Sequence, residues 1–278
     1  VLFSTMCVVT VVGNACMTLI IRMDSKLHAP MYFFLKNLSI LDICYSSVIT
    51  LKAALTFSLG RRIISYNGCA PQMFFFFHFG TTEALLRHLL LKDTYLPGHC
   101  NPLHYTTIMD RRACLWLALR CWLRGFLAPV LPTAFIFRLP FRGSNIINHF
   151  FCDSPPLLEL SCQDVFEIEV INFVVGTIVL MSSFNLTMIS YIFIVATTLH
   201  IPTAEGRSKA FSTCVSHLTI VTIFYRTTIF MYICTKTIQT FDFNKTVSVF
   251  YSMVTPVLNT VIYSLRNNDI KQGVRKVL

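Results

Sequence analysis

The sequence predicts an all-α membrane protein: a seven-transmembrane helix bundle with a short amphipathic C-terminal helix. Hydrophobic residues make up 54% of the 278 residues and charged residues only 13%, whereas soluble domains carry about 25% charged residues. The apolar residues recur in seven long runs separated by polar breaks. The basic residues concentrate in those breaks, which is how membrane proteins set their orientation.

Each apolar run is long enough to cross a bilayer, for which a helix needs about 20 residues. The runs are, in order, Val1–Ile21, Pro30–Ala54, Cys69–Asp93, Ala113–Phe137, Phe166–Leu199, Phe211–Cys234 and Val247–Leu265. An odd number of crossings places the two ends of the chain on opposite sides of the membrane. Residues 1–266 are therefore expected to form one transmembrane domain.

The third run is the central element of this prediction. Cys69 and Asp93 are 24 positions apart, and a helix of that length spans roughly 36 Å, enough to cross a bilayer with some tilt. The alternative is a buried helix of a soluble protein, which Arg87, His88 and Lys92 favour when this run is taken alone. The six other apolar runs favour the membrane helix.

The basic residues also predict the orientation of the chain. One set of short breaks, together with the C-terminal tail, is richer in lysine and arginine, which marks the cytoplasmic side. This set contains Arg22, Lys26, Arg111, Arg112, Arg207, Lys209, Arg266, Lys271, Arg275 and Lys276. The N-terminus is then extracellular and the C-terminus cytoplasmic.

The tail, residues 267–278, has a helical pattern of its own. Ile270, Val274 and Val277 fall at helical spacing with basic residues between them. This pattern is typical of an amphipathic helix lying on the anionic inner leaflet. The alternative is a solvated tail.

The same observations exclude several classes of function. A net charge of +10 would suit a nucleic-acid-binding protein, but here the charge lies in loops between apolar runs. The eleven cysteines show no C-x-x-C or paired Cys/His spacing, so we expect no metal site and no cofactor. The internal repeats of a transporter are not visible. The intramembrane charges do not converge as an enzyme would require, so no enzyme activity is expected.

Several motifs together resemble one family. They are Leu27–Ser39 at the start of the second run, Ser190-Tyr191, Lys209–His217, Pro256–Asn259 and Ile262–Asn267. On these motifs the chain resembles a vertebrate olfactory (odorant) receptor, a rhodopsin-like G-protein-coupled receptor, over essentially its whole length. The resemblance implies a multi-pass plasma-membrane receptor domain at residues 1–266 and a cytoplasmic tail helix at 267–278. It also implies binding of small apolar odorants and signalling through a stimulatory G protein to raise cyclic AMP.

The resemblance further implies a disulfide and a ligand pocket. Cys69 and Cys152 are expected to form a disulfide outside the membrane, where the compartment is oxidising. The pocket is expected between the third, fifth, sixth and seventh helices, with mainly apolar walls and a few polar anchors. The candidate ligand-binding residues are Phe76, Phe77, Gly80, Thr81, Asn172, Val175, Gly176, Val179, Tyr225, Thr228, Ile229 and Tyr232. The alternative for any one of them is an ordinary helix-packing position.

Two further sets of residues follow from the resemblance. Asn14, Asp42, Asn259 and Tyr263 are expected to form a polar switch cluster, suited to sodium and water, that rearranges on activation. The alternative is a purely structural set of interhelical hydrogen bonds. The residues expected to face the G protein are Asp93, Thr94, Tyr95 and Tyr191.

The chain departs from the family pattern at its cytoplasmic end. Thr94 replaces the arginine of an Asp-Arg-Tyr triplet, and Pro97 and Gly98 are expected to break the helix that follows. Arg87 replaces an apolar residue, although Glu83 could pair with it at i, i+4 spacing. These changes favour an alternative function, a degenerate, non-signalling membrane protein of the receptor fold.

Three more departures lie elsewhere. Arg142 replaces a cysteine, so the second loop bridge through Cys162 is not expected here. Thr260 replaces a proline, which removes a helix kink. Arg226 replaces a glycine inside the sixth run, where it would contact a ligand carboxylate or disturb the helix.

Overall fold

Helices are the regular elements throughout the part of the chain that the computed structural model describes. That part comprises residues 2–24, 27–59, 64–99, 109–141, 146–147, 149, 151–200, 203–233, 248 and 254–266. The helices are α1 (Leu2–Met23), α2 (Pro30–Leu59), α3 (Tyr66–His99), α5 (Arg111–Leu127), α6 (Val130–Ile136), α7 (Ser154–Leu158), α8 (Phe166–Leu199), α9 (Ala204–Ile233) and α11 (Thr255–Arg266).

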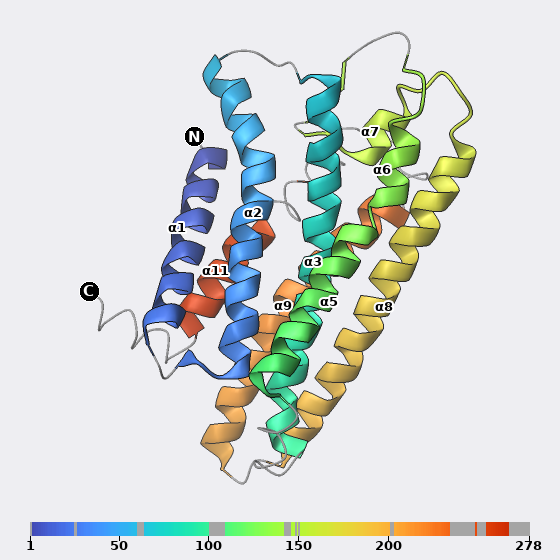
Figure 1. Ribbon diagram of the computed structural model, residues 1–278. Coiled ribbons are helices and arrows are strands. Elements are labelled where there is room, and N and C mark those ends of the chain that lie inside the picture. The colour runs from blue at the N-terminus through green and yellow to red at the C-terminus, as the bar shows by residue number, and fades with distance from the viewer. Residues whose placement is uncertain are drawn as a thin grey trace.

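The long helices lie side by side as an elongated bundle (Figure 1). Helix α1 packs against α2 and α11, α2 packs against α3, and α3 packs against α5 and α8. Helix α9 closes the bundle by contacting both α8 and α11. The short helix α7 lies at the end of the bundle where α3 begins (Figure 1). Helix α3 therefore lies among α2, α5 and α8, as its place in the sequence pattern suggested.

The helix boundaries follow the apolar runs, with three corrections. Helix α8 coincides with the predicted run Phe166–Leu199, but α9 begins at Ala204 and not at Phe211. Helix α3 continues through Pro97 and Gly98 to His99, so the predicted break is displaced to its end. Proline costs one backbone hydrogen bond in a helix, and only two helical residues follow Pro97.

The third correction concerns the fourth run, Ala113–Phe137, which was expected to be one helix. It divides into α5 and α6, with Ala128 and Pro129 in a turn between them. Pro129 and Pro132 lack backbone N–H groups, and each ring is incompatible with the carbonyl four residues earlier in a regular helix. Two prolines three residues apart therefore break the run and redirect α6 toward α8, which it contacts.

Local sequence explains where several helices begin. The Asp110 side chain accepts a hydrogen bond from the Ala113 backbone N–H (2.7 Å) and caps α5. Asp153 caps α7 in the same way through the Ser154 N–H (2.8 Å). Such side-chain caps satisfy backbone donors that have no partner in the first helical turn. Pro30, whose fixed φ suits the first turn, opens α2.

The distribution of side chains is that of a membrane protein. Large apolar side chains lie outward, including Val12 on α1, Trp116 on α5 and Ile192 on α8, whereas several charged and amide side chains are buried inside. Among the described residues, Thr5–Met23, Arg111–Ile136 and Phe166–Leu199 are long and apolar enough to cross a membrane. This arrangement suits a bundle surrounded by lipid, in which polar groups turn toward one another.

Some of the predicted features lie outside the described residues. They are the tail 267–278, Arg142, and the side chains of Asp93, Thr94, Tyr95, Tyr232 and Tyr263. The loop near Arg142 still joins two of its segments, since Phe141 forms an antiparallel bridge with Ser161. The Cys162 N–H donates to the Pro140 carbonyl at 3.4 Å.

Candidate ligand cavity and buried polar cluster

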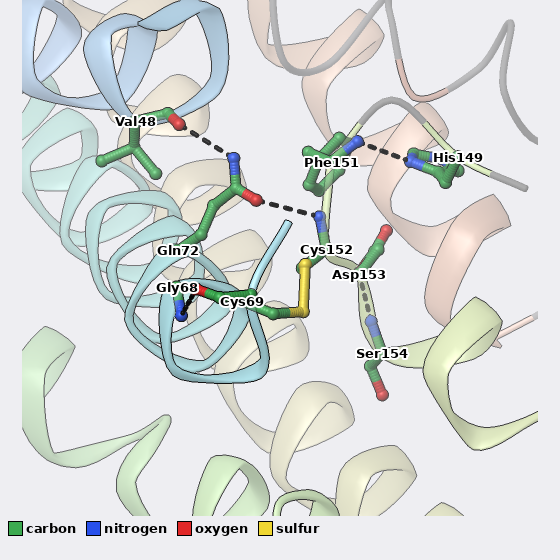
Figure 2. Close-up of a disulfide and its surroundings, with 10 residues drawn as sticks. Val48, Gly68, Cys69, Gln72, His149, Phe151, Cys152, Asp153 and Ser154 are labelled. Carbon is green, nitrogen blue, oxygen red and sulfur yellow. Dashed lines mark hydrogen bonds between the residues drawn. A yellow bond between two sulfur atoms is a disulfide. The ribbon is translucent and has the colours of Figure 1, made fainter. Parts of the chain in front are cut away.

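A disulfide joins α3 to the loop before α7, at the end of the bundle where α3 and α8 begin, which we call the outer end. Cys69, in the first turn of α3, is bonded to Cys152, as expected, with 5.6 Å between their Cα atoms. The Gln72 side chain lies beside this bridge (Figure 2). Its Oε1 accepts from the Cys152 N–H (3.2 Å), and its Nε2 donates to the Val48 carbonyl of α2 (3.1 Å). The loop is thus attached to both α2 and α3.

The residues that follow Cys152 connect the loop to helix α8. Asp153 and Ser154 are both buried, and Ser154 is the first residue of α7. The Asn172 Nδ2 of α8 donates to the Ser154 Oγ at 3.0 Å. The loop therefore places one hydroxyl group and one amide group together at the outer end of α8.

A cavity opens beside this polar pair. Its walls are mainly aromatic and aliphatic, and they come from α2, α3, the α5–α6 turn, α6, α8 and α9. The lining residues are Tyr45, Phe76, Phe77, Gly80, Thr81, Ala84, Ala128, Pro129, Pro132, Ser154, Asn172, Val175, Gly176, Val179, Leu180, Phe224 and Thr228. Apolar walls with a few polar groups are typical of a small-molecule site.

Nine of the twelve candidate ligand-binding residues line this cavity. They are Phe76, Phe77, Gly80, Thr81, Asn172, Val175, Gly176, Val179 and Thr228. Tyr225 and Ile229 do not line it, because α9 presents Phe224 and Thr228 instead. One position along a helix turns a side chain by about 100°, so Tyr225 and Ile229 lie on a neighbouring face of α9, while the predicted Thr228 lines the cavity.

The position of the cavity also differs from the expectation. The described residues of α11 contribute nothing to its lining, whereas Pro129 and Pro132 of the broken fourth run do. Helix α11 packs instead against α1, α2 and α9. The spacing of Pro129 and Pro132 was the sequence signal that could have placed the fourth run at the cavity.

Phe224 lines the cavity, and its neighbour Tyr225 packs between helices beside it. Tyr225 is 4% exposed and packs with Ala84, Leu180 and Tyr191. Its hydroxyl lies 3.4 Å from the Thr187 Oγ1. Phe224, 5% exposed, lines the cavity on one side and lies against the Arg87 guanidinium on the other. The distance from the Arg87 Cζ to the ring centroid is 5.4 Å, which is cation–π geometry.

A cluster of buried charged and amide side chains lies beneath Phe224. We call it the inner polar cluster, and it consists of Asp42, Glu83, Arg87 and Asn259. Their exposed fractions are 1%, 1%, 4% and 0%. Arg87 pairs with Glu83 one turn earlier on α3, as the sequence predicted, and its Nε donates to the Glu83 Oε1 at 3.1 Å. Arg87 also reaches α11, because its Nη2 donates to the Asn259 Oδ1 at 2.9 Å.

Asn259 connects three helices through its amide. Its Nδ2 donates to Asp42 of α2, with distances of 3.2 and 3.4 Å to the two carboxylate oxygens. The same Nδ2 lies 3.3 Å from the Glu83 Oε1. The donor side of the amide thus faces the two carboxylates and its acceptor side faces Arg87. Such an arrangement satisfies polar groups that would be costly if buried alone.

Asn14 joins this region indirectly. Its Nδ2 donates to the Thr260 Oγ1 (2.8 Å), the residue after Asn259 on α11. Three of the four residues expected in a polar cluster therefore lie in one region, although Asn14 contacts Thr260 and not Asp42. The family pattern did not predict the contacts of Arg87 and Thr260, because both residues depart from that pattern.

The sodium ion that the resemblance implies does not fit this cluster. A hard cation is held by oxygen atoms of carboxylates, amides and water. Here the Glu83 Oε1 and the Asn259 Oδ1 both accept from Arg87, and both Asp42 oxygens face the Asn259 amide nitrogen. A guanidinium already supplies the positive charge.

The remaining site residues occupy different environments. Arg226 is exposed on α9 and does not enter the cavity, so the predicted contact with a ligand is not found. Tyr191, expected to face a G protein, is buried against α9 side chains. The neighbouring Ser190 Oγ lies 3.4 Å from the His88 Nδ1 of α3.

Comparisons of the sequence with known proteins give one consistent result. A family model described as olfactory receptor matches residues 3–278. The chain is 44% identical over 278 residues to "Olfactory receptor 8U3" of Mus musculus, covering 100% of this chain and 87% of that protein. It is 46% identical over 279 residues to "Olfactory receptor 6Q1" of Homo sapiens, with 100% and 88% covered. Over 270 residues it is 47% identical to "Olfactory receptor 5B21" of Homo sapiens, with 97% and 87% covered.

Proposed function

Because the chain belongs to the olfactory receptor family, we propose that it is a seven-transmembrane G-protein-coupled receptor that binds small apolar odorants in the cavity between α3, α6, α8 and α9. The cavity is the observation that carries this proposal. Its walls are apolar except for a few positions, and the Ser154–Asn172 pair lies at its outer end. A ligand of matching chemistry is a small hydrocarbon body with one oxygen-containing group.

In this proposal the receptor lies in the plasma membrane with its N-terminus extracellular and its C-terminus cytoplasmic. The excess of basic residues in one set of loops supports that orientation. The disulfide supports it too, because Cys69 and Cys152 then face the oxidising side of the membrane. The odorant favours one of two arrangements of the helix bundle, and a stimulatory G protein responds at the opposite end by raising cyclic AMP.

The test is an odorant screen on the full chain with an N-terminal tag in intact cells. Surface labelling measures delivery to the plasma membrane, and a cyclic-AMP reporter measures signalling. We expect surface labelling of the native chain and responses to small apolar molecules that carry one carbonyl or hydroxyl group. Thr94→Arg is tested in parallel, and we expect it to increase the response, because it restores a cation at the cytoplasmic end of α3.

Two results would count against the proposal. One is a chain that is labelled at the surface but responds to no odorant in either the native or the Thr94→Arg form. The other is a tag that is accessible only after the cells are permeabilised, which would contradict the proposed orientation.

A further inference from the structure

We propose that Arg87 is a built-in counter-cation: its guanidinium takes the place of a bound metal ion in the inner polar cluster and makes the bundle insensitive to sodium. This inference does not depend on odorant binding or on G-protein coupling. It concerns the electrostatics of four buried side chains, Asp42, Glu83, Arg87 and Asn259.

The first step is the need for a cation. Asp42 and Glu83 are both 1% exposed and belong to two neighbouring helices of a bundle that lies in lipid. Carboxylates buried without a positive partner are costly, and in membrane proteins they are paired or hydrogen-bonded. Arg87 supplies the partner from within the chain through its bonds to the Glu83 Oε1.

The second step is the orientation of the Asn259 amide. With Arg87 present, the Asn259 Oδ1 accepts from the guanidinium, and its Nδ2 is directed at both carboxylates. The amide oxygen is the neutral oxygen that a cation would need. Removing the guanidinium would leave this oxygen without its donor and the Glu83 carboxylate without its cation. The Asn259 oxygen and the Asp42 and Glu83 carboxylates would then form a site of three oxygen-bearing groups for a small cation.

The third step is the position of the guanidinium between the cluster and the cavity. Its Cζ lies 5.4 Å from the centroid of the Phe224 ring, and Phe224 lines the cavity. A metal ion with a water shell could not pack on this ring as a planar guanidinium does. Arg87 thereby joins α9 to α3 and α11, in addition to balancing charge.

The experiment measures thermal unfolding of the full chain in lipid nanodiscs, with a thiol-reactive dye that reports exposure of the buried Cys114 and Cys121. Each protein is melted in sodium chloride and in N-methyl-D-glucamine chloride at equal ionic strength. The variants are Arg87→Met, the double variant Glu83→Gln/Arg87→Met, and Arg226→Met. The last is the matched control, because Arg226 is an exposed arginine on α9 outside the cluster.

We expect the native chain and Arg226→Met each to melt at one temperature in both salts. Arg87→Met should melt roughly 10 °C lower than the native chain without sodium. Sodium should restore roughly 4 °C of that loss, because a cation that binds only the folded state stabilises it. The double variant should melt above Arg87→Met and respond less to sodium, since one carboxylate has been neutralised.

The proposal is overturned if sodium stabilises the native chain as much as Arg87→Met. It is equally overturned if the double variant melts as low as Arg87→Met, because the loss would then come from packing and not from an unbalanced charge. Should Arg87→Met fail to fold, the proposal is overturned if sodium stabilises the native chain, or if the double variant also fails to fold, because the loss would then come from packing.

Discussion

The outer cavity and the inner polar cluster share helices α2 and α3, yet they are built in opposite ways. The outer region leaves space between apolar walls and has one hydrogen-bonded pair, Ser154 and Asn172, at its edge. The inner region is filled by two carboxylates, a guanidinium and an amide that satisfy one another. Phe224 separates the two, because it contacts both.

This difference indicates where sequence changes can be tolerated. A substitution at the cavity wall alters the shape of an empty space, so it should change ligand preference more than stability. A substitution in the inner cluster leaves a buried charge or amide without its partner, so it should change stability first. The substitutions that follow test this contrast, starting with the largest expected effect.

Removing the Glu83 carboxylate from the inner polar cluster should cause the largest loss of stability. Glu83→Leu leaves the Arg87 guanidinium buried without its ion-pair partner, which should cost roughly 3–5 kcal/mol of unfolding free energy. Thermal melting in nanodiscs measures the loss, and Glu159→Leu, at an exposed glutamate, serves as the control. The double variant Glu83→Leu/Arg87→Leu should recover much of the stability. Equal melting of Glu83→Leu and the native chain would contradict the account of the inner region.

Removing the disulfide between Cys69 and Cys152, which supports the outer region, should cause the next largest loss of stability. Cys152→Ser removes a bridge that closes a sequence separation of 83 residues, and it should cost about 3 kcal/mol. We expect lower surface labelling and a lower melting temperature. Cys162→Ser, at an exposed cysteine outside this bridge, is the control and should behave like the native chain. If the two variants behave alike, the bridge does not support the outer region.

A smaller effect is expected where α1 approaches α11 beside the inner cluster. A methyl group at Gly13 would overlap the Thr260 Cγ2, so Gly13→Ala should cost about 2 kcal/mol through overpacking. Adding Thr260→Ser removes that methyl group but keeps the hydroxyl that accepts from Asn14. The double variant should therefore melt near the native temperature. If adding Thr260→Ser does not restore the melting temperature, α1 and α11 do not approach each other at Gly13 as closely as described.

The smallest effect is expected at the polar edge of the cavity. Asn172→Ala removes the amide that donates to Ser154 at the cavity. Without this polar group, oxygen-containing odorants should lose about 1 kcal/mol of binding free energy, which is roughly a five-fold loss of potency. Concentration–response curves in the cyclic-AMP assay measure this loss. Asn185→Ala, at an exposed position on the same helix, should leave the curves unchanged. An equal loss in both variants would argue against a ligand contact at Asn172.

The sequence predicted the features that depend on local spacing. The length and composition of Phe166–Leu199 placed α8 at its observed bounds, and the i, i+4 spacing placed Glu83 beside Arg87. Local spacing could not show that Arg87 also reaches Asn259, which is 172 positions away. On α9, Thr228 of the candidate residues lines the cavity together with Phe224, whereas Tyr225 and Ile229 do not line it.

Family resemblance predicted the cavity walls better than it predicted the inner cluster. The expected residues of α3 and α8 line the cavity, because their positions follow from the register set by Cys69 and from the bounds of α8. Arg87 in the inner polar cluster and Thr260 beside it differ from the family pattern, so the pattern carried no information about their partners. The partner Glu83 of Arg87 was predicted only from the pairing of opposite charges at i, i+4 spacing.

Binding of odorants to the purified chain is the most direct test of the central claim that the cavity is the ligand site. Gly176 lines the cavity, and a Cβ placed there meets no other atom within 4 Å, so Gly176→Phe should fill the space without disturbing the fold. We predict that odorants raise the melting temperature of the native chain in nanodiscs but not that of Gly176→Phe, while the two ligand-free proteins melt alike. Equal stabilisation of both proteins by the same odorants would contradict the claim.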